Sequence, residues 1–163
     1  MSISSSTNER GVAMVEFAII LPLLLIIFLG IAELGRALLF QHRLTSAVEA
    51  GARYAARATG AVNPATCGAT GGAWTTAEAT ARQMVTFGQL SGGTEPVVPG
   101  LTTDDVAVSL AQRTVTGIDD PVCVVRVFVS VQYQGIFGAQ FIPLLDIPQP
   151  RLGATSEERY IGE

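Results

Sequence analysis

The sequence predicts an α+β fold: a long amino-terminal transmembrane helix that continues into a small head, made of a short helix and a three-stranded antiparallel sheet. Three observations predict it. Residues 12–32 are apolar apart from one glutamate, residues 33–60 keep a helical composition without proline, and the carboxyl-terminal third contains runs in which apolar and polar residues alternate. We therefore expect a pilin-like shape, with one helix far longer than the head that it carries.

The length and the net charge of the chain limit the classes of protein to which it can belong. The chain has 163 residues, which is enough for one compact domain and a membrane segment. The net charge is −4 and every basic residue is an arginine, so no lysine-rich or arginine-rich run points to nucleic acid. We expect one domain and no nucleic-acid partner.

The run at residues 12–32 has the length of a membrane-spanning helix. About 21 residues rising about 1.5 Å each cover about 30 Å, the thickness of a bilayer core. Glu16 is the only charge in the run, and a carboxylate in hydrocarbon costs about 2–4 kcal/mol, which marks it as a candidate functional residue. The alternative is a cleaved secretory signal peptide, with Arg10 as its charged region and residues 17–29 as its apolar region.

The helical pattern continues beyond the membrane run. Without a break, one helix from about Val12 to Thr59 would be about 70 Å long and would end near Gly60 as a C-cap. Pro22 is expected to kink or loosen its membrane half, because it removes one N–H and crowds the preceding turn.

The outer half of this helix carries a stripe of small residues. Ala47, Gly51 and Ala55 are spaced i, i+4, i+8, which permits close approach of another helix. The same residues also fit the plain helix propensity of an alanine-rich segment, and both interpretations stay open. Glu49 and Arg53 are spaced to form an i, i+4 ion pair.

The head is predicted from residue 61 onward. We expect a loop at residues 61–76, with Trp74 in the core or at its rim, a short helix at residues 77–90, and a turn-rich connector. Two strands at residues 104–115 and 121–134 then form a hairpin, and residues 150–160 form a weaker third strand. In the second strand one face is entirely valine: Val125, Val127, Val129 and Val131.

Few residues are candidates for chemistry. Cys67 and Cys123 suit a disulfide if the head lies outside the cytoplasm, the alternative being two unrelated buried thiols. His42 is the only histidine and has no nucleophile motif near it, so triad catalysis is not expected. We expect no enzyme, no metal centre and no cofactor.

Two aspartate pairs flank the predicted hairpin. Asp104/Asp105 and Asp119/Asp120 could hold a calcium ion, although such pairs at strand ends are more often turn residues. The calcium interpretation stays a side hypothesis.

The opening stretch resembles a known processing site. "RGVAMVEF", followed by an apolar helix with an early proline, resembles the cleavage site of type IV pilin-like proteins. More closely, residues 10–58 resemble the TadE-like family of the tight-adherence (Flp) pilus system, through a joint pattern of G-x-x-x-x-E-F, proline, E-L-G-R and A-R-Y-A. Beyond Thr59 the resemblance is only architectural.

This resemblance implies a pseudopilin, a minor pilin or an assembly factor, cut between Gly11 and Val12 by a prepilin peptidase. Glu16, with Phe17 beside it, would then pair with a free amino terminus, within one chain or between neighbours. The expected regions are a cytoplasmic leader at residues 1–11, a transmembrane helix at residues 12–32, a periplasmic extension at residues 33–60 and a periplasmic head at residues 61–163. The implied partners are the prepilin peptidase, other pilin-like subunits and the lipid bilayer.

The charges that flank the apolar run do not favour this orientation. Arg10 precedes the run, whereas Arg36 and Arg43 follow it, so the positive-inside rule gives no support to a cytoplasmic amino terminus. The expectation of an inner-membrane protein with a periplasmic head rests on the resemblance. A membrane-anchored periplasmic binding module is the alternative function.

Overall fold

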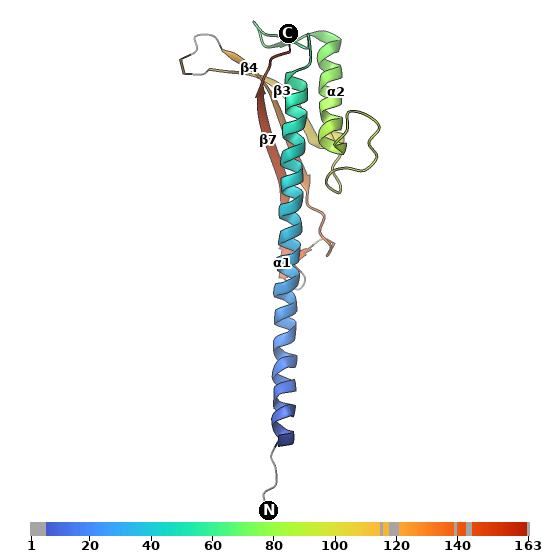
Figure 1. Cartoon of the computed structure of the whole chain (residues 1–163), viewed down its shortest axis with the longest axis vertical. Helices are drawn as coiled ribbons and strands as arrows, with labels where there is room; N and C mark the ends of the chain where they lie inside the picture. Colours follow the sequence, from blue (N-terminus) through green and yellow to red (C-terminus); the bar gives the residue numbers. More distant parts are fainter. Residues whose placement is uncertain (1–5, 115, 118–120, 139, 143–144, 163) are drawn as a thin grey trace, which may run out of the picture. The chain divides into compact units, whose positions relative to one another are not determined.

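The computed structural model of the chain describes residues 6–114, 116–117, 121–138, 140–142 and 145–162. It confirms the α+β class, with a long helix, a short helix and a three-stranded antiparallel sheet (Figure 1). In chain order the elements are α1 (Ser6–Ala56), β1 (Val62–Asn63), β2 (Gly68–Ala69), α2 (Gly71–Phe87), the 3-10 helix η1 (Thr103–Asp105), β3 (Val106–Arg113), β4 (Val122–Gln132), β5 (Gln140–Ile142), β6 (Leu145–Pro148) and β7 (Arg151–Arg159).

The chain divides into two compact units. Unit 1 consists of Met1–Arg36 and Gly135–Gln149, and unit 2 of Ala37–Gln134 and Pro150–Glu163. Both units therefore contain part of α1. The expected regions at residues 1–11, 12–32, 33–60 and 61–163 describe membrane topology rather than compactness, and they stay a prediction.

Helix α1 is shifted relative to its predicted bounds. It begins at Ser6 rather than near Val12, so the part of the expected leader that the structure describes is helical, while residues 1–5 lie outside the described residues. It ends at Ala56 rather than Thr59, because the next amides bond three residues back, as Arg57 N does to Tyr54 O at 3.2 Å. Gly60 then adopts φ +66°, which explains its place in the turn.

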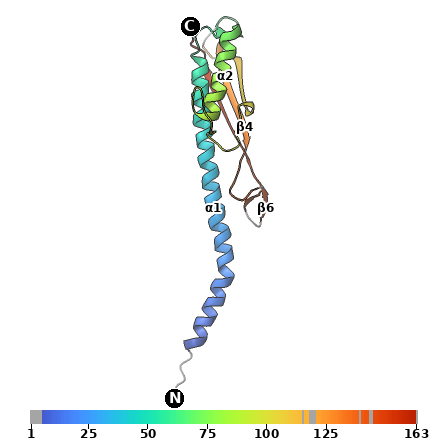
Figure 2. The ribbon, with the colours of Figure 1, turned by 90° about the vertical axis from the view of Figure 1, so that its right-hand side faces the viewer.

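Unit 2 has a core of small and branched apolar residues between α1, α2 and the sheet (Figures 1 and 2). Buried residues recur every three or four positions along α1, as one face of a helix requires. They are Ala37, Phe40, Leu44, Val48, Ala52 and Ala55. Trp74 is buried in α2, and the Phe40 and Tyr133 rings lie 5.9 Å apart between α1 and the end of β4.

The sheet has the strand order β3-β4-β7, with both pairs antiparallel. The valines predicted to share one face of β4 are all buried, whereas Arg126 and Phe128 on the other face are exposed. The register places Val108 opposite Val127, and Val127 opposite Ser156. The predicted hairpin and third strand are therefore confirmed, and one face of the sheet remains open.

The bounds of the short helix were predicted wrongly. Helix α2 begins at Gly71 rather than residue 77, and it ends at Phe87 rather than residue 90. Its end follows from Gly88, which lies at φ +70° and donates its N–H to Met84 O at 2.9 Å. The segment expected to be a loop at residues 61–76 therefore contains β1, β2 and the first turn of α2.

Unit 1 contains a second small hairpin that the sequence analysis did not predict. Strands β5 and β6 pair antiparallel within the long connection between β4 and β7. The Gln149 amide donates a hydrogen bond to Gly138 O at the base of this segment. This excursion belongs to the same compact unit as the amino-terminal part of α1.

Candidate functional site

The predicted processing site lies on the exposed surface of α1. Gly11 and Val12 are both exposed, and a Cβ placed on Gly11 would meet nothing within 4 Å. Internal packing therefore does not require a glycine at this position, although glycine disfavours a helix by about 1 kcal/mol relative to alanine.

Glu16 lies one turn after Val12 on the same exposed surface. Gly11, Val12, Val15, Glu16 and Ile19 line one shallow open concavity along the helix. Among the residues that the structure describes, no hydrogen bond or ion pair is recorded for Glu16. This carboxylate therefore lies beside an apolar strip and has no ion-pair partner within the described part of the chain.

The rest of the apolar run is also exposed. Phe17 has 59% of its surface accessible. Helix α1 passes through Pro22 without interruption, and Figure 2 shows it curving in this first stretch. Among the described residues, one helix is long and apolar enough to cross a membrane, at Gly11–Ala56; its most apolar 18-residue window has a mean hydropathy of 2.9, and none of that window is buried. A stretch of this kind requires an apolar environment other than the protein's own core.

The stripe of small residues lies partly in a helix–helix seam. A Cβ on Gly51 would come within 2.5 Å of Val85 Cγ2 and 3.2 Å of Ala81 O, both in α2. Ala55 is fully buried and Ala47 is half-buried. The close approach of α1 to α2 at Gly51 requires a residue without a side chain, so helix propensity alone does not account for the stripe.

The expected ion pair on the exposed side of α1 is present but loose. Arg53 Nη2 lies 3.9 Å from Glu49 Oε2, and both side chains are about half exposed. An exposed pair of this kind adds a few tenths of a kcal/mol at most.

Glu33 is a further candidate that residue-level reasoning missed. It is fully buried, and its Oε1 accepts a hydrogen bond from the Ile136 N–H at 2.9 Å. The contact joins α1 to the excursion between β4 and β7 inside unit 1. The available signal was a second carboxylate just after the apolar run, in the "ELGR" stretch.

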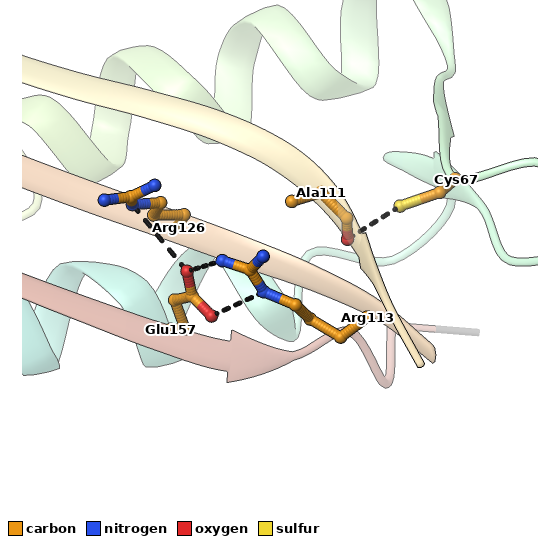
Figure 3. Close-up of polar contacts among 5 residues, drawn as sticks. All are labelled: Cys67, Ala111, Arg113, Arg126 and Glu157. Atoms are coloured by element: carbon orange, nitrogen blue, oxygen red, sulfur yellow. Dashed lines mark hydrogen bonds and ion pairs between the residues drawn. The ribbon is translucent and has the colours of Figure 1, made fainter. Parts of the chain in front are cut away.

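Cys67 and Cys123 are joined by a disulfide with a Cα–Cα distance of 5.3 Å. The bond ties the β1–β2 segment to the beginning of β4. Cys67 Sγ also lies 3.5 Å from Ala111 O on β3 (Figure 3). A disulfide sulfur carries no proton, so we treat this as a packing contact and not as a donated hydrogen bond.

The metal hypotheses receive no support from the described part of the chain. No group of three histidine, cysteine, aspartate or glutamate residues there is placed to hold a metal. Asp105 Oδ2 instead accepts hydrogen bonds from the Thr102 N–H and hydroxyl at 2.9 and 2.7 Å, as a helix cap. Asp119 and Asp120 lie outside the described residues. His42 lies exposed on α1.

Comparison with known families agrees with this geometry. Residues 11–53 match the model of the TadE-like protein family. The amino-terminal helix is TadE-like. The matched segment begins at Gly11 and takes in Glu16, Pro22, Glu33 and Gly51.

The TadE-like match indicates a Tad pilus-associated protein with an amino-terminal membrane-type helix. The family is one of pilus components rather than enzymes. No curated protein and no solved structure matches the chain. The head beyond residue 53 is therefore described by its own structure alone.

Proposed function

We propose that this chain is a pilin-like subunit or assembly factor of a tight-adherence pilus, cut by a prepilin peptidase after Gly11. The observation that carries the proposal is an exposed apolar helix with one carboxylate near its start, inside the TadE-like match. In this proposal α1 crosses the bacterial inner membrane, the amino terminus is cytoplasmic and the head is periplasmic. The Cys67–Cys123 disulfide supports an oxidising compartment for the head.

Cleavage would give Glu16 a partner. It would make Val12 the first residue, with an α-amino group that is mostly cationic at neutral pH. A carboxylate one turn away, near a helix amino terminus, is stabilised by that ammonium and by the helix dipole. The pair would form within one chain or between a chain and its neighbour, and in either case it would lower the cost of a charge in the membrane.

Cleavage would also require a local change of structure. Gly11 and Val12 lie inside α1 in the full-length chain, five residues or more from its first residue. A peptidase needs access to the backbone of the bond that it cuts, so we expect the first turns of α1 to unwind when the enzyme binds. Helix ends fray readily, which makes this change a small one.

Mass spectrometry of the protein isolated from its native membrane tests the proposal most directly. We expect a mature chain that begins at Val12. An intact Met1 would contradict processing and favour the membrane-anchored binding module. A cut beyond Leu29 would contradict the membrane subunit and support a secretory signal peptide.

Substitutions separate processing from assembly. We expect Gly11→Leu to leave the full-length chain in the membrane, because its side chain fills the space that the peptidase needs. Glu16→Ala leaves that bond untouched, so cleavage should persist while pilus formation falls, and Glu16→Asp should be intermediate. Glu49→Ala, which removes an exposed carboxylate elsewhere on α1, is the matched control. Normal pilus formation by a cleaved Glu16→Ala chain would show that Glu16 is not a pairing group.

A further inference from the structure

The open face of the sheet is strongly basic for a chain of this charge. Side chains alternate along a strand, and the register brings four arginines and one glutamate to the face that does not contact the helices: Arg113, Arg126, Arg151, Arg159 and Glu157. Their net charge is +3. The remaining residues therefore carry −7 of the chain's total of −4.

The arginines are held over the sheet by short polar contacts (Figure 3). Arg113 forms a two-pronged pair with Glu157, with Nε 3.0 Å from Oε2, and Arg126 Nε lies 3.7 Å from Glu157 Oε1. Arg151 Nε donates to Ser130 Oγ at 3.3 Å. The single carboxylate of Glu157 pairs with two guanidinium groups, so the face keeps a net positive charge. The Arg113–Glu157 pair also shows the geometry in which an arginine of this face can bind a carboxylate.

Phe128 lies in the middle of this basic face. Its side chain is 43% exposed, and its register neighbours are the small residues Ala107 and Thr155. The ring is therefore accessible from above. An aromatic centre with arginines around it is the composition typical of a protein contact surface.

Residues 78–105 of the same unit carry the opposite charge, with four acidic residues and one arginine. This segment contains the carboxyl-terminal part of α2, the connector and η1. Leu90 is 52% exposed, and Glu95 and Asp104, which follow it in the same segment, are also exposed. Arg82 is the only cation of the segment, and it is bound to Glu78 at 2.7 Å. We call this segment the acidic segment.

We propose that the basic sheet face of one copy of this chain binds the acidic segment of a second copy. Phe128 would contact Leu90, and the arginines would pair with carboxylates such as Glu95 and Asp104. Because the two surfaces differ, the contact is head-to-tail and leaves one of each surface free for a further copy. Every residue of the contact belongs to unit 2, and the contact goes beyond the proposed function, resting on it only for the membrane anchoring that brings copies together.

The size of the face indicates a weak contact. Three strands about 4.8 Å apart and about eight residues long, at about 3.3 Å each, form a flat area of about 350 Å². Stable protein pairs bury about 800 Å² on each side. We therefore expect association to depend on a high local concentration, as anchoring in one membrane provides, and to weaken at high salt.

Photo-crosslinking of the full-length protein in its membrane tests the contact. The photoreactive residue benzoylphenylalanine replaces Phe128, and crosslinked dimers are digested with trypsin. Cleavage after Arg82 and Arg113 releases the part of the acidic segment that contains Leu90, Glu95 and Asp104 within the peptide of residues 83–113. Crosslinks to that peptide of a second copy are expected. Crosslinks only to residues 127–151, to α1 or to another protein would overturn the proposal.

Charge reversal provides a second, independent test. Arg126→Glu with Arg151→Glu reverses the sheet face, and Glu95→Arg with Asp104→Arg reverses the acidic segment. Each double variant alone should lose self-association about tenfold or more, and a mixture of the two should regain it, because opposite charges then meet in every contact. Arg53→Glu near the end of α1, with Arg57→Glu directly after it, makes the same change in net charge at two exposed positions and should have no effect. Unchanged association of the sheet-face variant, or no recovery in the mixture, would overturn the proposal.

Discussion

At the scale of single residues, Glu33 joins two distant segments of unit 1. A buried carboxylate is costly unless hydrogen bonds compensate it, and Glu33 accepts one from the Ile136 N–H. We expect Glu33→Ala to leave that amide without this acceptor, at a cost of about 1–3 kcal/mol in local stability. Glu33→Gln keeps a carbonyl oxygen and should cost less.

Hydrogen exchange at Ile136, in the full chain in detergent, measures this effect. The alanine variant should exchange faster by a factor of about 10 or more, and the glutamine variant should remain close to the original chain. Equal exchange in all three proteins would show that the contact does not hold the excursion.

Glu157 predicts a pH effect of known sign. The hydrogen bond from Arg113 lowers the pKa of the Glu157 carboxyl below its usual value, with smaller contributions from the charges of Arg113 and Arg126, while desolvation acts in the opposite direction. A lowered pKa in the folded state means that the ion pair stabilises above the unfolded-state pKa. This stabilisation is lost as the pH falls through the folded-state value.

We therefore expect Glu157→Gln to lower the thermal midpoint slightly at pH 6–7, and we expect this difference to shrink as the pH falls below the usual range of a glutamate carboxyl. Thermal unfolding at low salt measures this, and the difference should shrink at high salt because the pair is exposed. A difference that grows toward acid pH would contradict this assignment.

At the scale of elements, the α1–α2 seam depends on a missing side chain. Gly51→Leu would drive atoms into Val85 and into the Ala81 carbonyl, and overpacking of this kind costs about 1–3 kcal/mol or more. The same change at Gly35, where a Cβ meets nothing within 4 Å, should be neutral or slightly stabilising because leucine is the better helix former.

The single tryptophan reports the result, because Trp74 is buried on the same face of α2 as Ala81 and Val85. Urea unfolding followed by its fluorescence should shift to lower urea for Gly51→Leu and not for Gly35→Leu. Equal shifts would mean that leucine in α1 disturbs the protein for a reason unrelated to the seam.

The disulfide should contribute to the stability of the head. It closes a loop across a sequence separation of 56 residues, which corresponds to about 4 kcal/mol in the chain-entropy model. Cys67→Ser with Cys123→Ser should lower the unfolding free energy by an amount of this order, as measured by Trp74 fluorescence in urea. Alkylation of the original chain should find no free thiol, and two labelled cysteines would contradict the bond.

At the scale of the whole molecule, regular patterns were predictable and irregular ones were not. The alternation in β4 and the apolar length of α1 arise from local periodicity, so the sheet and the long helix followed from sequence. The early start of α2 at Gly71 did not, because two glycines and two threonines at residues 71–76 favour a loop by propensity. There the Thr75 and Thr76 hydroxyls donate to Gly72 O at 2.9 Å.

The candidate site divides in the same way. Glu16 and Pro22 break an otherwise apolar helical run that Gly11 directly precedes, so local sequence is enough to name all three as candidates. Glu33 and the basic sheet face depend on residues more than 40 positions apart that meet only after folding. No spacing rule along the chain connects Glu33 with Ile136, or Arg113 with Glu157.

The segment of unit 2 that is synthesised last, at the end of β7, is also the segment that joins the sheet to the end of α1. Ile161 N donates to Ala56 O at 2.9 Å, and the Tyr160 hydroxyl donates to Ala58 O at 2.7 Å and accepts from Ala61 N at 3.1 Å. These partners are synthesised about 100 residues apart, and a ribosome adds about 5–20 residues per second. The carboxyl-terminal end of α1 therefore leaves the ribosome roughly 5–20 s before β7 can complete the sheet, and the apolar part of α1 leaves it earlier still. During biosynthesis the helix must find a bilayer or a chaperone before the head exists.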